Sequence, residues 1–290
     1  MFNLMYRLRL KLVTVKALFI IGLLVLFTHG VSATTAPQLV IIIDDIGHSL
    51  PLGHRAAMLP GPINIAVLPH QKNSITLAEL AYQQGQDILL HAPMSNTQGR
   101  DPGKGTLTAN MAKDEFIRTL KNNLQAIPHV QGVNNHMGSL LTQLPEPMSW
   151  VMETLRQQQL YFVDSRTSPS TIAQVKAKAY QLPNLKRDVF LDNNRDENAI
   201  HHQLELLLSI ADRQGIAVAI GHPYPETLSV LEQVLPGLAL RGYQLTTISQ
   251  LLAPPTPKCQ PELDYRQLFE PACQIQIAVK KPTNHKASIY

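Results

Sequence analysis

From Leu39 onward, short apolar runs alternate with longer amphipathic runs along the chain. The short runs are rich in β-branched residues and are bounded by Gly, Pro, Asn or Asp, which predicts buried strands, whereas the longer runs predict helices. Strands that alternate with helices form parallel sheets, so the pattern predicts an α/β protein. We expect strands at Leu39–Ile43, Ile63–Leu68, Asp87–Leu90, Gly132–Asn134, Tyr161–Val163, Val189–Leu191, Ile216–Ile220 and Leu245–Ile248, and helices at about 73–84, 112–126, 146–159, 170–180, 196–214 and 225–241.

The number of these units indicates how the strands are arranged. About seven strand–helix units fall within residues 38–252, which favours a (β/α) barrel, complete or incomplete, over an open doubly wound sheet. The predicted helix at 196–214 shows the helical period, because Ile200, Leu204 and Leu207 form one apolar stripe. No Gly-x-Gly-x-x-Gly or Gly-Lys-Ser/Thr loop follows a predicted strand, so we expect no nucleotide partner.

The chain begins with a basic and apolar leader. Arg7, Arg9, Lys11 and Lys16 precede an apolar run over residues 17–27, and Val31-Ser-Ala33 has the small residues of a signal-peptidase site. The run has about 11 residues, whereas a membrane-spanning helix needs about 20. We interpret residues 1–33 as a cleaved signal peptide, with an uncleaved anchor as the alternative. We therefore expect a periplasmic protein with no stable membrane span after the signal is removed.

Net charge changes this picture only through the leader. The chain carries 25 Lys and Arg against 21 Asp and Glu, and the four basic leader residues account for the whole formal charge of +4. The remainder is neutral, so no basic surface for nucleic acid is expected. Hydrophobic residues make up 44% of the chain and charged residues 16%, which excludes a chain that is mainly disordered.

Both cysteines lie in the segment after the last predicted strand. Residues 253–290 begin with Ala-Pro-Pro-Thr-Pro and are interpreted as an extended C-terminal tail. In an oxidising compartment, Cys259 and Cys273 are expected to form a disulfide that closes a small loop, with two free thiols as the alternative. This placement argues against a thiol nucleophile or a zinc–thiolate site.

Polar residues follow five of the predicted strands, and the carboxyl ends of parallel barrel strands meet on the face where catalytic residues lie. The sharpest case is Asp44-Asp45 after Val-Ile-Ile-Ile, because two adjacent carboxylates near a buried edge repel each other unless a cation or proton is shared. A metal ion removes the conflict, and a helix N-cap at Asp45 is the alternative. The other four ends are Leu90-His91, Asn134-Asn135-His136, Val163-Asp164-Ser165 and Gly221-His222.

Three of these ends carry histidines. One carboxylate and two imidazoles suit a zinc-like divalent ion and leave a position open for water, which is the ligand number of a catalytic site. His222 lies between Gly221 and Pro223, two residues of special φ that fix its backbone, and a general acid needs a stable position. The remaining histidines are interpreted as loop or rim residues, although His70, at another strand end, is kept as a candidate for substrate contact.

These motifs together resemble the polysaccharide deacetylase superfamily, which has the NodB-like barrel. The runs His91-Ala-Pro-Met, Gly132-Val-Asn-Asn-His-Met-Gly-Ser139, Val163-Asp-Ser-Arg-Thr167 and Gly221-His-Pro-Tyr-Pro-Glu-Thr-Leu228 are similar to its divergent polysaccharide deacetylase branch of bacterial envelope proteins. The resemblance covers about residues 38–252, and several motifs in the same order make it specific. It implies a NodB-like (β/α) barrel.

The resemblance also implies roles for individual residues. Asp44 matches the general base, Asp45 and His91 match metal ligands, and His222 matches the acid that protonates the leaving amine. The superfamily's second motif has two histidines four residues apart, but position 95 here is Ser, so we expect His136 to be the missing ligand. The Arg-Pro-x-Tyr-like third motif is absent, and Asn134, Asn135 and Asp164 are expected to replace it in orienting the base and binding substrate.

The expected function is hydrolysis, with a divalent metal ion, most simply Zn²⁺, of an N-acetyl group on an amino sugar of an envelope polysaccharide. A non-catalytic envelope protein that binds glycan or a partner on the same barrel is the first alternative, because of the missing histidine and third motif. A metal-dependent glycosidase is the second alternative. The adjacency of Asp44 and Asp45 argues against it, since neighbouring side chains cannot lie on both sides of a glycosidic bond.

Overall fold

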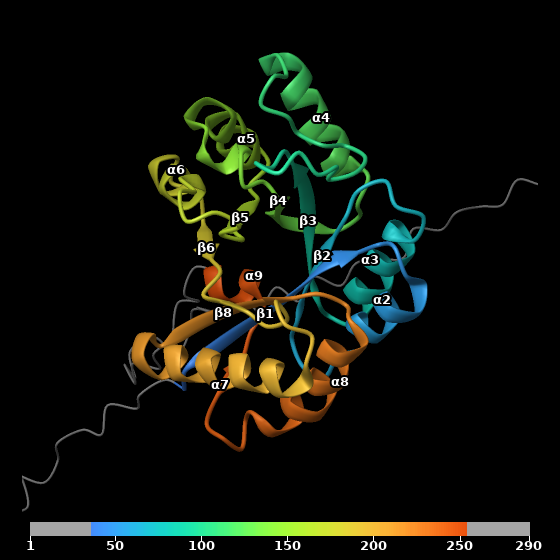
Figure 1. Cartoon of the computed structure of the whole chain (residues 1–290), viewed down its shortest axis with the longest axis vertical. Coiled ribbons are helices and arrows are strands. Elements are labelled where there is room, and N and C mark those ends of the chain that lie inside the picture. The colour runs from blue at the N-terminus through green and yellow to red at the C-terminus, as the bar shows by residue number, and fades with distance from the viewer. Residues whose placement is uncertain (1–35, 254–290) are drawn as a thin grey trace, which may run out of the picture. The chain divides into compact units, whose positions relative to one another are not determined.

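The computed structural model describes residues 36–253, which form strands alternating with helices (Figure 1). The leader prediction, Cys259 and Cys273 all lie outside the described residues. The strands are β1 (Gln38–Ile46), β2 (Asn64–Val67), β3 (Asp87–Met94), β4 (Val130–Met137), β5 (Tyr161–Asp164), β6 (Asn184–Lys186), β7 (Val189–Phe190), β8 (Ile216–Gly221) and β9 (Gln244–Leu245). The helices are α2 (Leu50–Ala57), α3 (Ser74–Gln83), α4 (Lys113–Gln125), α5 (Pro145–Gln157), α6 (Ala173–Ala179), α7 (Glu197–Gln214), α8 (Pro225–Val234) and α9 (Ile248–Leu252).

The strands form one curled parallel sheet in the order β6-β5-β4-β3-β2-β1-β8-β7, and β9 pairs with the beginning of β1. Helices α2 to α8 lie around the outside of the sheet (Figure 1). The sheet does not close by strand pairing, because β6 and β7 are its two edges. The prediction of an incomplete NodB-like (β/α) barrel is therefore confirmed.

Two residues join these edges along the chain. The backbone N–H of Arg187 donates to the Asp164 carbonyl on β5 at 2.9 Å, and that of Asp188 donates to the Val218 carbonyl on β8 at 2.8 Å. The Arg187 guanidinium donates to the carbonyls of Ser165 and Arg166 and lies 3.7 Å from the centre of the Phe190 ring. The gap between the edge strands β6 and β7, here called the seam, is thus bridged by two backbone hydrogen bonds and by the Arg187 side chain.

Successive residues of a strand point to opposite faces of the sheet, so each strand contributes alternate side chains to an inner and an outer apolar layer. On β1, Leu39, Ile41 and Ile43 pack in the outer layer against the helices. Val40 and Ile42 pack in the inner layer, inside the barrel, together with Ile248 of α9. Each of these side chains is fully buried, which stabilises the fold by about 1.5–3 kcal/mol apiece. Residues that continue the inner parity at strand ends therefore face the interior.

Capping residues define both ends of α7. The Asp196 side chain caps α7 by accepting a hydrogen bond from the Ala199 N–H at 3.1 Å, and Gly215 ends the helix with a φ of +79°. The apolar stripe predicted for α7 is buried as expected. Helices α2 and α9 and strand β6 were not predicted: α2 begins with Leu-Pro-Leu-Gly, and β6 has only three residues between two polar turns. The predicted strand at Leu245–Ile248 is wrong in its second half, because β9 ends at Leu245 and Ile248 begins α9.

Packing at Gly132 on β4 provides a test of this arrangement. A methyl group at this position would lie 2.0 Å from the ring of Tyr161, a side chain that is only 5% exposed. Gly132→Ala should therefore destabilise the protein by about 1–3 kcal/mol, as other overpacked cores do. Urea unfolding of both proteins measures the difference.

Gly237→Ala is the matched control, because no atom lies within 4 Å of the added methyl group there. Equal stability of Gly132→Ala and the wild type would mean that β4 and β5 do not pack as described.

Candidate metal and catalytic site

The inner parity of the strands brings the polar residues of four strand ends to one place. Asp44 continues the inner positions Val40 and Ile42, and His91 follows Leu89, which is also inner. On β4, Asn134 and His136 share one face, and Asn134 pairs in register with His91. His222 follows Ile220 on β8. Asp44, His91, Asn134 and His136 lie within their strands, because β1, β3 and β4 end three or four residues later than predicted, and His222 directly follows β8.

Asp45 reaches the same site by a break in the strand. Adjacent strand residues normally point to opposite faces, but Asp45 has a φ of +58° and the register of β1 shifts between Ile43 and Ile46. Aspartate tolerates this left-handed conformation better than most side chains. Both carboxylates can therefore face the interior, and such local strain is typical of functional sites.

Asp45, His91 and His136 form a group that could hold a metal ion. Asp45 Oδ1 lies 3.0 Å from His136 Nδ1 and 3.2 Å from His91 Nε2, and the two nitrogens are 3.1 Å apart. Ligands bound at about 2.0–2.1 Å in a tetrahedral arrangement are about 3.3 Å apart, close to these distances. The structure thus brings the three predicted ligands together.

The chemistry of these atoms also fits a cation. Asp45 Oδ1 is buried, and among the described residues it accepts no hydrogen bond of good geometry. Burial raises the pKa of Asp45, but the contacts with His136 and His91 outweigh it and hold that pKa well below its usual range. Asp45 is therefore ionised, and a buried anionic oxygen without a donor is costly unless a cation lies beside it.

Asn134 connects the metal-ligand group with Asp44. Its Oδ1 accepts a hydrogen bond from His91 Nδ1 at 2.8 Å, and its Nδ2 donates to Asp44 Oδ1 at 2.7 Å. Because Asn134 holds the Nδ1 proton of His91, the other ring nitrogen, Nε2, is the atom that faces Asp45 and can bind a metal ion once it is unprotonated. One fully buried amide thus orients a candidate metal ligand and the candidate base together.

Asp44 is in a position to accept a proton beside this group. Its Oδ2 lies 3.6 Å from His91 Nε2, and the residue is only 2% exposed. Burial raises the pKa of Asp44 above its usual value, although His91, His222 and the amide of Asn134 act against it. A carboxylate with a raised pKa is a stronger base near neutral pH.

His222 approaches from β8 and is held by Asp192, a residue that the sequence analysis missed. Asp192 accepts from the His222 backbone N–H at 2.6 Å and from His222 Nδ1 at 2.9 Å, and the Thr227 hydroxyl also donates to it. The free ring atom, Nε2, lies 3.9 Å from Asp45 Oδ2. Burial lowers the pKa of His222, but the charges of Asp192, Asp44 and Asp45 outweigh it and raise it to about 9.

The other predicted site residues have partners within the protein. Asn135 accepts from the Ser165 N–H and donates to the Met137 carbonyl, and Asp164 accepts from the Arg166 N–H and the Thr171 hydroxyl. Both are buried, and they tie β4 and β5 to the loop that follows β5. Substrate contact by Asn134, Asn135 or Asp164 stays a prediction. His70 lies outside the group, with Nε2 2.9 Å from Asn123 Oδ1.

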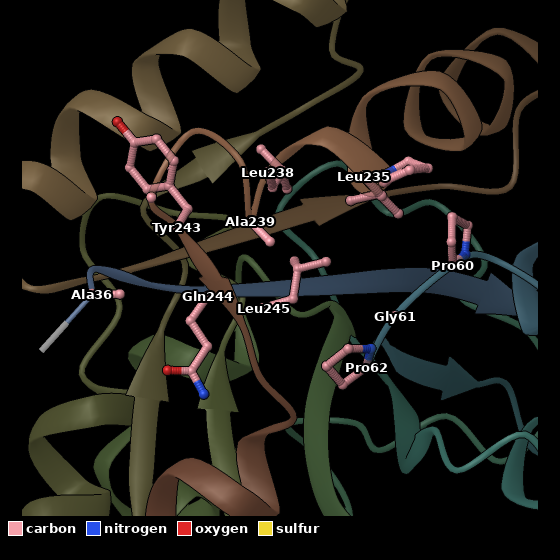
Figure 2. Close-up of a pocket in the computed structure, with 12 residues that line it drawn as sticks. Ala36, Pro60, Gly61, Pro62, Leu235, Leu238, Ala239, Tyr243, Gln244 and Leu245 are labelled. Carbon is pink, nitrogen blue, oxygen red and sulfur yellow. The ribbon is translucent and has the colours of Figure 1, made fainter.

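Two cavities lie at opposite ends of the strands. One, of about 220 Å³, is lined by Asp45 and His222 among others and adjoins the site. The other, of about 500 Å³, is lined by residues near the beginning of β1, among them Ala36, Gln244 and Leu245 (Figure 2). At about 3.3 Å per strand residue, β1 separates it from Asp45 by more than 20 Å. The smaller cavity is therefore the one that concerns the site.

The curled parallel sheet and the position of this site place the protein in the NodB-like class of (β/α) folds. Residues 41–252 match the family described as divergent polysaccharide deacetylase, and the chain belongs to that family.

The chain is similar to two curated proteins. It is 35% identical to the uncharacterized protein YibQ of Escherichia coli K12 over 204 residues, which cover 70% of this chain and 64% of YibQ. This chain thus spans less than two thirds of the length of YibQ. It is 33% identical to an uncharacterized protein of Haemophilus influenzae, over 69% of this chain and 72% of that one. Among solved structures, an uncharacterized protein from Agrobacterium tumefaciens C58 has a similar fold, with a TM-score of 0.72 and 24% identity over 76% of this chain and 91% of that one.

The ligand group predicts which substitutions abolish metal binding. Asp45→Ala, His91→Ala and His136→Ala each remove one of three ligands and should lose zinc, whereas Asp44→Asn keeps all three and should retain it. Affinity should fall as pH is lowered, because protons compete for the same atoms. Metal analysis and titration calorimetry of the purified proteins measure both effects.

His129→Ala is the matched control, since His129 pairs with Glu79 away from the group. Loss of zinc from Asp44→Asn as complete as that from Asp45→Ala would make both carboxylates ligands and contradict the assignment of Asp44.

The Asp192–His222 pair predicts a pH dependence. In metal-free protein, Asp192→Asn removes the main cause of the raised pKa, so the pKa of His222 should fall from about 9 toward or below 6.5. The stabilisation from the raised pKa is fully present below about pH 6.5 and is lost as pH rises through about 9. Ring-proton NMR titration gives the pKa, and urea unfolding across this range gives the stability.

A His222 pKa that is the same in both proteins would mean that Asp192 does not control its charge.

Proposed function

We propose that this protein hydrolyses the N-acetyl group of an amino sugar in an envelope polysaccharide. The observation that carries the proposal is the position of Asp44, a buried carboxylate beside the group of Asp45, His91 and His136 and on the same interior face as His222. Membership of the divergent polysaccharide deacetylase family supports the same substrate class.

Zinc is the metal ion that we propose for this group, because tetrahedral sites with nitrogen and carboxylate ligands favour it. A bound zinc ion would polarise the amide carbonyl and lower the pKa of a water molecule. Three protein ligands leave a coordination position open, as catalytic zinc sites do.

The protein's own residues supply the two proton transfers. Asp44, oriented by Asn134, accepts a proton from the attacking water. His222 directs its Nε2 toward the site, and its bond to the Asp192 carboxylate raises the pKa of the ring, so it can hold a proton and donate it to the departing nitrogen. Asp192 keeps the His222 ring in the tautomer and orientation for this transfer. The products are acetate and a free amino sugar.

Acetate release tests this function. Wild-type protein with zinc should release acetate from N-acetylated glycans such as peptidoglycan fragments or N-acetylglucosamine oligomers. Asp44→Asn cannot accept the proton, so its kcat should fall by about 10²–10⁴-fold while zinc is retained. His222→Ala should also retain zinc and lose kcat. The assay follows acetate by coupled enzymes or NMR.

Two results decide between this function and a non-catalytic one. Release of acetate by wild type but not by Asp44→Asn supports hydrolysis at this site. Tight zinc binding without acetate release from any glycan in the panel would favour a glycan- or partner-binding protein on a deacetylase scaffold. His129→Ala serves as control, because His129 pairs with Glu79 away from the site.

We also propose that the protein acts in the periplasm, after cleavage of residues 1–33. The basic and apolar leader supports export. Within residues 36–253 no helix is both long and apolar enough to cross a membrane. N-terminal sequencing of protein from the cell envelope should find Thr34 first, and mass spectrometry should find a Cys259–Cys273 disulfide. An intact Met1 in the membrane pellet would instead indicate an anchor, and two free thiols would remove the disulfide.

A further inference from the structure

The cavity beside the site is larger and more apolar than an acetyl group requires. It adjoins Asp45 and His222, and its wall continues over Ile46, Leu52, Pro223 and Tyr224. Ile46 is 1% exposed, and Leu52 on α2 is partly buried against the apolar core, so the cavity lies between the end of β1 and that helix. Its volume of about 220 Å³ exceeds that of an apolar cavity of about 150 Å³ that binds benzene.

A sugar ring would fit this lining poorly. Each sugar hydroxyl that loses water needs a hydrogen-bond partner, and an unpaired one costs about 1–3 kcal/mol. Ser49 in the lining accepts from the Leu52 N–H as the N-cap of α2, and His48 is the one other polar side chain of the wall besides Asp45 and His222. Ile46, Leu52, Pro223 and Tyr224 present hydrocarbon and aromatic ring, so a sugar would find few partners for its hydroxyls. An acyl chain needs no such partners and gains from burial.

We propose that this cavity binds the acyl chain of the substrate and that the protein removes N-acyl groups longer than acetyl, of about four to six carbons, from amino sugars. The inference rests on the proposed function and adds the substrate's acyl class to it. The reaction balances as for acetyl: the water oxygen bonds to the acyl carbon, the carbon–nitrogen bond breaks, the nitrogen takes a proton, and the acyl group leaves as a carboxylate.

A chain-length series tests the proposal. Glucosamine oligomers bearing acetyl, propanoyl, butanoyl or hexanoyl groups are compared by kcat/KM with wild-type, zinc-loaded protein. Each methylene buried in the cavity should raise kcat/KM about fourfold, as follows from about 0.8 kcal/mol per methylene, up to the length that fills the cavity. A tenfold fall with each added methylene would overturn the proposal and leave acetyl hydrolysis standing. Failure to release any acyl group would contradict the proposed function, and the inference with it.

Two leucines on α2 provide a matched pair of variants. Leu52 lines the cavity, whereas Leu50, two residues earlier, is 48% exposed and does not. Leu52→Trp should reduce kcat/KM for butanoyl and hexanoyl substrates by tenfold or more and change that for acetyl by less than threefold. Leu50→Trp should change none of them. Equal losses on all chain lengths in Leu52→Trp would place the acyl chain elsewhere.

Two further measurements keep the proposal testable if Leu52→Trp does not fold. Leu52→Ala enlarges the cavity and should extend the preference toward hexanoyl. In Asp44→Asn, calorimetric titration with the same oligomers should show affinity rising with acyl length, and an affinity independent of length would overturn the proposal.

Discussion

Asp44 and Asp45 are adjacent carboxylates at the end of a strand that is buried on both faces. They must be compensated by polar side chains from the neighbouring strands. Two anions in this position destabilise the fold unless positive charge or proton donors surround them. The structure provides these from three other strands: His91 on β3, His136 and Asn134 on β4, and His222 at the end of β8. Parallel alignment makes this possible, because it brings all the carboxyl ends to one face.

Much of this arrangement could be predicted from the sequence because it follows from strand periodicity. The short strand-like runs predicted β1, β3, β4 and β8. In a parallel sheet the polar residues that follow such strands lie at the same edge. His136 as partner of His91 is a case of this: the two lie on adjacent strands, with Asn134 in register with His91. His136, on the neighbouring strand, thus lies where it could replace the histidine that is absent at Ser95.

Other features leave little trace in the sequence. Asp192 follows the two-residue strand β7, and nothing in its local sequence distinguishes it from a turn aspartate such as Asp188 or Asp196. Its role comes from tertiary contacts with His222 and Thr227, 30 and 35 residues later. Helix α2 has a Gly and a Pro within eight residues, so its stability comes from the Ser49 cap and packing rather than from helix propensity. The conformation of Asp45 likewise depends on the register shift of β1.

The short link Arg187–Asp188 between β6 and β7 limits where the chain can accept an insertion. The candidate ligands precede this link in the sequence, on β1, β3 and β4, whereas Asp192 follows it, after β7. A two-residue link leaves no room for an inserted loop at this place, since both of its N–H groups already bond to β5 and β8. An inserted loop is therefore better accommodated at the other loops around the rim, while the spacing between Asp44 and His222 is fixed independently, because Ile43 and Gly221, the residues before them, pair directly between β1 and β8.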